Sequence, residues 1–164
     1  MTIILKNKAT LIFEDFIFRC SIGKKGLVKK KIEGDKKTPI GTFSLGNLYY
    51  RKDRHAKPET KLKCIPINET MGWCDDIKNK KNYNKLIKVN KNIKHEKLHR
   101  RDNKYDFVII INYNTKKIKV GKGSAIFIHL TKNFKPTLGC IALSKKDLLI
   151  LLKIIKKTTK IKIS

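Results

Sequence analysis

The apolar residues of this chain fall into short runs that are separated by polar turns. A run such as Phe107–Ile111 fits one buried strand, whereas a helix that crosses a bilayer needs about 20 apolar residues. Hydrophobic residues make up 40% of the 164 positions, which is enough for a packed core and too many for a disordered chain. The sequence therefore predicts one domain, residues 1–164, made mostly of strands and without a transmembrane segment.

Two groups of strands are predicted, one towards each end of the chain. Segments rich in β-branched and aromatic residues form the first group: Thr2–Leu5, Ala9–Phe13, Phe16–Ser21 and Gly41–Leu45. The second group contains Tyr105–Tyr113, Lys116–Val120, Ala125–Leu130, Cys140–Leu143 and the alternating segment around Ile161 and Ile163. A turn at Asn114-Thr115 is expected to join its two neighbours as a hairpin.

One helix is indicated near the C-terminus. Ser144 can accept a hydrogen bond as its N-cap, and Asp147 stands three residues later, as in a capping box. The apolar residues of 148–155 cover a wide face, and Lys156-Lys157 suit the C-terminal end. The expected fold class is mostly β (α+β), with this helix packed on the strands.

Between about residue 48 and residue 101 the chain is polar and irregular. Pro58 and Pro66 exclude one long helix there. Because a long excursion in a compact domain is more often functional than filler, this segment is expected to form a lid or a wall of a binding site.

The chain is strongly basic. Forty Lys and Arg residues against thirteen Asp and Glu residues give a formal charge of +27, which favours partners such as nucleic acid, an anionic membrane surface or an acidic wall polymer. However, most of the excess positive charge comes from Lys residues that are spread through a chain also rich in Asn and Ile. This pattern is typical of a general compositional bias. No Arg-rich or aromatic-interleaved stripe typical of nucleic-acid readers occurs, so no specific nucleic acid is expected as a partner.

Four cysteines lie at positions 20, 64, 74 and 140. They form no C-x-x-C pair, and a domain with an adequate core has little need of disulfides, so neither a structural zinc site nor a disulfide framework is expected. Cys20 and Cys64 stand in apolar contexts that are typical of a core. Cys74 precedes Asp75 and Asp76, whose carboxylates disfavour a thiolate.

The segment His95-Glu96-Lys97-Leu98-His99 fits the zinc-protease pattern H-E-x-x-H. On a helix its two histidines would share one metal ion, but the lysines and arginines in and around the segment would place positive charge beside that ion. No third ligand stands at a recognisable spacing. We therefore expect no metal and no cofactor, and interpret the segment as a solvated charged turn. His55, which lies in a run of charged residues, is also expected to be exposed.

The densest chemical signal is a histidine and a cysteine on successive predicted strands. His129 ends an apolar strand, and Cys140 begins the next one after a connection long enough to fold back. A neighbouring imidazole lowers the pKa of a thiol and favours the reactive thiolate. Gly139 removes a Cβ beside the sulfur, which lets a substrate carbonyl approach backbone N–H groups. The pair is thus a candidate nucleophile and base, although a buried cysteine and a structural histidine are the commoner case.

Several motifs occur in order along most of the chain. The first is Gly34-Asp35-x-x-Thr38-Pro39-x-Gly41-x-Phe43, and the last is Gly123-Ser124-Ala125-Ile126-Phe127-x-His129 with Pro136-Thr137-x-Gly139-Cys140. Between them lie Gly72-Trp73-Cys74-Asp75-Asp76, Tyr83-Asn84 and a pattern from Glu96 to Asp106. Together they resemble the catalytic domain of the L,D-transpeptidase (YkuD-like) family, in its Thr-x-Gly-Cys branch. The resemblance implies a β-sandwich with the C-terminal helix packed on it.

The same resemblance implies a cysteine acyltransferase that acts on peptidoglycan stem peptides. Cys140 would attack the carbonyl before the terminal D-residue of a tetrapeptide, release D-alanine and form a thioester, and an amine of a second stem would then complete a 3→3 cross-link. His129 would be the base, oriented by the backbone carbonyl of Leu130, and Gly139 and Cys140 would supply N–H groups to the oxyanion. Acylation by carbapenem-type β-lactams is implied as well.

The chain departs from the pattern of many family members near the cysteine. Leu138 stands where they carry a second histidine, and Ile141-Ala142-Leu143 lacks their arginine. Polarisation of the carbonyl and recognition of the carboxylate must then come from elsewhere, and Thr137 is a candidate through its hydroxyl. The candidate substrate-binding residues are Trp73, Tyr83, Asn84, Arg100 and Ser124.

Two other functions stay open. The nearer is an L,D-carboxypeptidase, in which water replaces the amine acceptor. The other is a non-enzymatic basic module that binds nucleic acid or an anionic wall polymer, and such binding should weaken steeply with salt. The resemblance implies the cell envelope or periplasm, but Ile3-Ile4-Leu5 is followed by Lys6 and Lys8 and shows no signal peptide. A monomer is expected.

Overall fold

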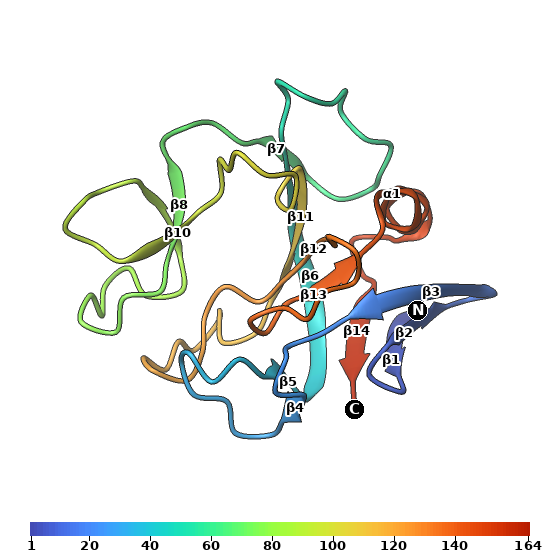
Figure 1. Ribbon diagram of the computed structural model, residues 1–164, viewed down its shortest axis with the longest axis horizontal. Helices are drawn as coiled ribbons and strands as arrows, with labels where there is room; N and C mark the ends of the chain where they lie inside the picture. Colours follow the sequence, from blue (N-terminus) through green and yellow to red (C-terminus); the bar gives the residue numbers. More distant parts are fainter.

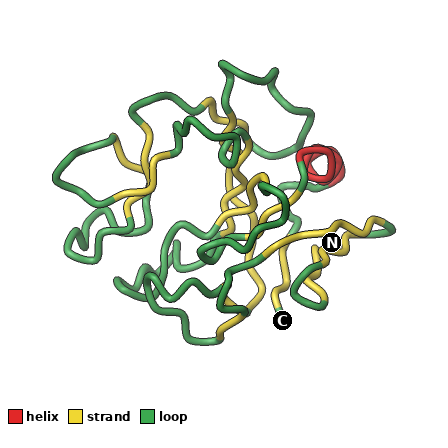
Figure 2. The backbone as a smooth tube through the Cα atoms, viewed as in Figure 1, coloured by secondary structure: helices red, strands yellow, loops and turns green.

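A computed structural model describes residues 1–164, and its main feature is one large sheet with a helix beside it (Figure 1). The sheet has nine strands in the order β11-β12-β13-β3-β2-β1-β14-β6-β7, and β11 also pairs with β6. Because β11 pairs with both β12 and β6, the sheet closes on itself around the core. The predicted mostly β fold with a C-terminal helix is confirmed, and Figure 2 shows the strands at the centre with long loops around them.

The strands of the large sheet are β1 Thr2–Lys6, β2 Thr10–Phe13, β3 Phe16–Ser21, β6 Gly41–Tyr50, β7 Cys64–Pro66, β11 Phe107–Ile111, β12 Phe127–Leu130, β13 Ile141–Leu143 and β14 Lys160–Ile163. The other strands are β4 Leu27–Val28, β5 Thr38–Pro39, β8 Met71–Cys74, β9 Leu86–Lys88 and β10 His95–Lys97. All the predicted strands except Lys116–Val120 therefore have a counterpart near the predicted place.

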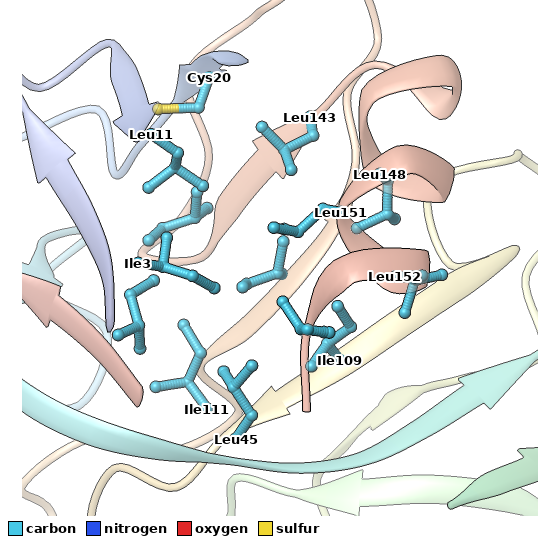
Figure 3. Close-up of a cluster of buried hydrophobic side chains, with 14 of the residues drawn as sticks. Ile3, Leu11, Cys20, Leu45, Ile109, Ile111, Leu143, Leu148, Leu151 and Leu152 are labelled. Carbon is cyan, nitrogen blue, oxygen red and sulfur yellow. The ribbon is translucent and has the colours of Figure 1, made fainter. Parts of the chain in front are cut away.

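The core lies between the inner face of the large sheet and the helix α1, Lys145–Ile154 (Figure 3). Leu148, Leu151 and Leu152 of α1 are fully buried, and each buried leucine side chain contributes about 1.5–3 kcal/mol. The predicted N-cap is confirmed, because the Asp147 N–H donates to Ser144 Oγ at 3.1 Å. The chain has no helix with the length and apolar content that crossing a membrane requires.

Alternation along β12 separates the core from a second apolar cluster. Ile128 pairs with Ile141 of β13, and both belong to the main core. Since successive side chains of a strand point to opposite faces, Phe127 and His129 point away from that core. Phe127 belongs to a second cluster of nine buried residues that also contains Cys140. The two faces of β12 thus serve different purposes, and the candidate site lies on the face opposite the main core.

The segment between residues 48 and 101 holds more regular structure than the sequence predicts. Strand β6 continues to Tyr50, and β10, β8 and β9 form a separate three-stranded sheet in that order. Each of these three strands has only three or four residues. Pairing between them, such as Glu96 with Trp73 and Gly72 with Ile87, stabilises them where local propensity does not.

The predicted strand Lys116–Val120 and its hairpin are wrong. The Asn114 side chain instead closes a loop: its Nδ2 group donates to the carbonyls of Lys119 at 3.0 Å and Gly123 at 2.9 Å. Its Oδ1 atom accepts from the Lys119 N–H at 2.8 Å. These bonds satisfy backbone groups that a hairpin would pair, which is the way asparagine side chains compete with regular structure.

The expectation that His55 is exposed is also wrong. Its Nε2 atom lies 2.7 Å from Oδ2 of Asp106, and its ring lies 4.8 Å from that of Phe107. Asp106 is buried and accepts a second bond, from Arg54 at 2.8 Å. A buried carboxylate requires polar partners, and the charged run around His55 supplies them.

Candidate active site

His129 and Cys140 line one pocket with a volume of about 640 Å³. His129 belongs to β12, and Cys140 directly precedes β13, the parallel neighbour of β12. Ala142 pairs with His129, so Cys140 lies two residues from the register partner of the histidine. The connection between the two strands folds back as the sequence predicts, and both side chains reach the same pocket.

Two backbone groups hold the Cys140 sulfur. The Phe127 N–H donates to Sγ at 3.4 Å, and the thiol donates to the Ala125 carbonyl at 3.2 Å. Ala125 has a positive φ of 52°, and its own N–H donates to Oδ1 of Asn84 at 3.1 Å. The thiol is therefore buried and oriented by the strand that carries the histidine, while it still borders the pocket.

The tautomer of His129 follows from its one hydrogen bond. Nδ1 lies 2.8 Å from the carbonyl oxygen of Leu130, as the resemblance implied for that carbonyl. A carbonyl oxygen only accepts, so Nδ1 carries the proton and Nε2 of the neutral ring has a free lone pair. Tyr105 packs against the imidazole in an edge contact, with 5.2 Å between ring centres. The ring is thus prepared to accept a proton at Nε2.

Burial dominates the ionisation of the pair. Burial raises the pKa of the Cys140 thiol to about 12 and lowers the pKa of His129 to about 4. The resting pair is therefore a neutral thiol and a neutral imidazole. The sequence led us to expect a lowered pKa for the thiol, whereas the pKa is raised, chiefly through the loss of solvation on burial. A reaction at this sulfur would therefore require that the thiol proton be transferred to a base.

The turn before the nucleophile needs glycine. Gly139 has a φ of +142°, and a Cβ there would lie 2.9 Å from the carbonyl oxygen of Lys37. Its own carbonyl accepts from Thr38 Oγ1 at 2.9 Å, and Thr38 Oγ1 accepts from the Gly23 N–H at 2.9 Å. Thr38 of the first motif therefore fixes the backbone of the Gly139-Cys140 turn.

Thr137 stabilises the same turn from the other side. Its hydroxyl donates to the carbonyl of Cys140 at 2.6 Å and accepts from the Gly139 N–H at 3.1 Å. The hydroxyl is thus occupied within the turn rather than directed at a substrate. The Gly139 N–H is occupied as well, whereas the Cys140 N–H makes no hydrogen bond within the protein. Of the two N–H groups expected for an oxyanion, only that of Cys140 is available.

Three of the candidate substrate-binding residues lie behind the site and do not line the pocket. Trp73 Nε1 donates to Asn84 Oδ1 at 2.9 Å, and Asn84 Nδ2 donates to the carbonyl of Asn114 at 2.8 Å. Tyr83 is fully buried, and its hydroxyl accepts from the Gly123 N–H at 3.1 Å. Since their polar atoms already have protein partners, we assign Trp73, Tyr83 and Asn84 to the scaffold of the catalytic segment.

The other two candidates, Arg100 and Ser124, do line the pocket. Arg100 binds Asp102 through two hydrogen bonds of 2.8 and 2.7 Å, and its guanidinium lies 5.1 Å from the ring centre of Tyr105. Ser124 Oγ donates to Oε2 of Glu33 at 2.6 Å. These residues have protein partners and are also within reach of a bound ligand.

The H-E-x-x-H segment is neither a helix nor a solvated turn. His95 to Lys97 form β10, and His99 lies beyond the end of that strand, so the two histidines do not share one face of a helix. No group of three His, Cys, Asp or Glu side chains lies close enough to hold a metal. Glu96 instead accepts from the Tyr105 hydroxyl at 2.8 Å, and this links β10 to the residue that packs on His129. All four cysteines are free thiols.

Two residues at the site carry no individual sequence signal. Lys31 is one of forty Lys and Arg residues, and only the structure shows that it is buried beside Gly139. Glu33 accepts from both Ser124 and the Tyr83 hydroxyl, yet it stands just before the first motif. Thr38 does belong to that motif, so the sequence singled out its position. Its hydrogen bonds to Gly23 and Gly139 could not be predicted from the sequence.

Comparisons with known proteins were made for the whole chain. The family model YkuD, described as the L,D-transpeptidase catalytic domain, matches residues 2–163. No curated protein matches the sequence. The solved structure of the helical cell shape determining protein Pgp2 from Campylobacter jejuni is similar over 99% of this chain, with 19% identity and a TM-score of 0.53. The chain spans 46% of that protein, and the similarity concerns the fold.

Proposed function

Because the chain belongs to the YkuD family of L,D-transpeptidase catalytic domains, we propose that it is a peptidoglycan L,D-transpeptidase with Cys140 as nucleophile. The observation that carries the proposal is the bond between His129 Nδ1 and the Leu130 carbonyl, which leaves Nε2 as an acceptor in the pocket that Cys140 lines. A buried base of fixed tautomer beside a thiol is the arrangement that nucleophilic catalysis needs.

The first half-reaction forms a thioester. Sγ of Cys140 attacks the carbonyl before the terminal D-residue, and the thiol proton passes to Nε2 of His129. The carbonyl oxygen becomes an oxyanion that accepts from the Cys140 N–H. Collapse of this intermediate breaks the C–N bond, and His129 returns the proton to the leaving amine of D-alanine. The amine of a second stem then attacks the thioester and forms the 3→3 cross-link, as the thiol is regenerated.

The charges of the pocket support a stem peptide as the substrate. Cationic side chains line it more often than anionic ones: the cations are Lys31, Lys36, Lys94, Arg100, Lys104, Lys132 and Lys135, and the anions are Glu33, Asp75, Glu96 and Asp102. Stem peptides carry several carboxylates and one free amine, so an excess of cations with some carboxylates matches their charges. The segment between residues 48 and 101 supplies Asp75, Lys94, Glu96 and Arg100, as expected of a wall of the site.

We further propose the cell envelope as the place of action and cell shape as the property affected. The structural neighbour from Campylobacter jejuni is a helical cell shape determining protein. The shared fold makes the same role the first one to test for this chain.

The proposal is tested with a purified stem tetrapeptide as donor and a second stem as amine acceptor. Mass spectrometry of the products should show release of D-alanine together with the cross-linked dimer. Release of D-alanine with only tripeptide formed would identify an L,D-carboxypeptidase instead. Cys140→Ala should abolish both products, whereas Cys64→Ala, which removes a partly buried thiol outside the pocket, should retain them. Absence of any product, with binding that collapses in salt, would favour the basic module.

A further inference from the structure

A buried lysine lies beside the nucleophile. The Lys31 side chain is only 3% exposed, and its ammonium donates to Asp35 Oδ1 at 2.5 Å and to the Lys37 carbonyl at 2.8 Å. An ammonium group has three N–H donors, so one donor of Lys31 has no partner in the protein. Lys31 lines the same pocket as Cys140, so this third N–H can donate to a ligand that is bound there.

Gly123 of the catalytic segment makes room for this lysine, and Gly139 lies next to its ammonium group. A Cβ at Gly123 would lie 2.8 Å from Cδ and Cε of Lys31, and Gly123 has a φ of +98°. A Cβ at Gly139 would lie 3.4 Å from Nζ of Lys31. The lysine stem thus passes Gly123, and its ammonium arrives next to the residue that precedes Cys140. A surface lysine would not need a glycine beside its stem and a carboxylate at its ammonium group to hold it in place.

The oxyanion of the proposed reaction needs a second donor. The Gly139 N–H is bound to Thr137, and the Cys140 N–H makes no hydrogen bond within the protein. We propose that the Lys31 ammonium is the second oxyanion donor and acts opposite the Cys140 N–H. The inference rests on the proposed function, because it names a residue of that same site. Lys31 is then a catalytic residue, since it touches the reacting oxygen.

The step can be followed for a carbapenem as well as for a stem peptide. As the Cys140 sulfur bonds to the carbonyl carbon, the π electron pair moves to the oxygen, which accepts from Lys31 Nζ and the Cys140 N–H. When the carbonyl reforms, the C–N bond breaks, and the nitrogen takes the proton that His129 had received. Lys31 remains protonated throughout. Asp35 holds the Lys31 ammonium in place. A positive charge therefore lies beside the substrate oxygen when that oxygen is negative.

The other charged and titratable groups around the sulfur are few. Lys31 and Lys104 favour the thiolate, and Glu96 disfavours it. His129 and Tyr105 complete the set. A substitution at Lys31 can therefore act on the thiolate as well as on the oxyanion, and the experiment must separate the two effects.

Two reactions of the same sulfur separate them. Alkylation by iodoacetamide requires the thiolate but forms no oxyanion, whereas acylation by a carbapenem requires both. The ratio of the two second-order rate constants, measured at one pH, thus isolates the oxyanion. For Lys31→Met we expect this ratio to fall about 100-fold, the usual loss for one oxyanion donor. The control is Lys153→Met, which breaks the exposed ion pair with Glu59 far from the pocket and should leave the ratio unchanged.

The outcomes are distinguishable. If acylation and alkylation of Lys31→Met fall by the same factor, or neither falls, the role of Lys31 as oxyanion donor is overturned. If this variant does not fold, Lys31→Met combined with Asp35→Asn removes both charges and keeps one amide oxygen, which can accept from the Ile32 or the Lys37 N–H, and the same ratio decides. A wild-type protein that is alkylated but never acylated contradicts the proposed function itself.

Discussion

The hydroxyl of Thr38 donates to the carbonyl of Gly139 at 2.9 Å, across 101 positions of the sequence. The same oxygen accepts from the Gly23 N–H, and all of these groups are buried. One side chain of the first motif therefore connects the N-terminal part of the chain to the turn that presents Cys140. This contact joins the two motifs: one contains Cys140, and the other fixes the backbone beside it.

Replacement of Thr38 by valine keeps the shape and removes both hydrogen bonds. We expect a loss of about 1–3 kcal/mol in the free energy of unfolding, because two buried backbone groups lose their partner. Acylation of Cys140 should slow as the turn becomes mobile. Chemical denaturation and carbapenem acylation rates measure the two effects. Thr42→Val, at an exposed position of β6, is the control and should change neither quantity.

Gly139→Ala should destabilise the protein more than Gly121→Ala. Both glycines have a positive φ, of 142° and 79°, so both substitutions strain the backbone. Only at Gly139 would the new methyl group also approach a backbone oxygen, that of Lys37, at 2.9 Å. Thermal unfolding gives the melting temperature of each variant. Gly121→Ala reports backbone strain alone, and Gly139→Ala reports strain together with a steric clash. Equal melting temperatures would contradict the close approach.

The pKa of His129 makes stability depend on pH. Burial holds it at about 4 in the folded protein, against 6.5 as the ordinary value, so the unfolded chain binds the proton more readily. Stability should thus be fully present above pH 6.5 and fall as the pH drops from there to about 4, by about 3 kcal/mol in total from this residue. Denaturation at several pH values measures the slope.

The matched variant for that measurement is His129→Gln, which cannot titrate in this range. Its stability should depend less on pH between 6.5 and 4 than that of the wild type. His99→Gln removes a partly exposed histidine outside the pocket and should retain the wild-type slope. The same slope in His129→Gln and the wild type would show that His129 is not a buried neutral base.

Local patterns were sufficient for most of the fold. The strand Phe16–Ser21 occurs as predicted, and the Ser144 cap starts the helix, because β-branched runs and caps act over a few residues. The strands β8, β9 and β10 escaped prediction since segments of three or four residues form strands only when partners elsewhere in the sequence pair with them. The predicted strand Lys116–Val120 does not form, because the Asn114 side chain closes a loop there.

The candidate site likewise contains features that the sequence predicted and features that it could not predict. Cys140, His129, Gly139 and the Leu130 carbonyl come together where the motifs suggested, since His129 and Leu130 lie on β12, and Gly139 and Cys140 directly precede the neighbouring strand β13. The ionisation of the thiol and the imidazole could not be predicted, because burial depends on the whole fold. Lys31 was hidden among many lysines, and only its path past Gly123 and Gly139 distinguishes it.

Covalent modification of the sulfur tests the central claim most directly. Intact-mass spectrometry after exposure to a carbapenem, followed by peptide mapping, should show one adduct per chain, on Cys140, and none in Cys140→Ala. Cys74 is the internal control, because burial raises the pKa of its thiol as it does for Cys140, but Cys74 does not line the pocket. An adduct that persists in Cys140→Ala, or that maps to Cys20, Cys64 or Cys74, would contradict the assignment of the nucleophile.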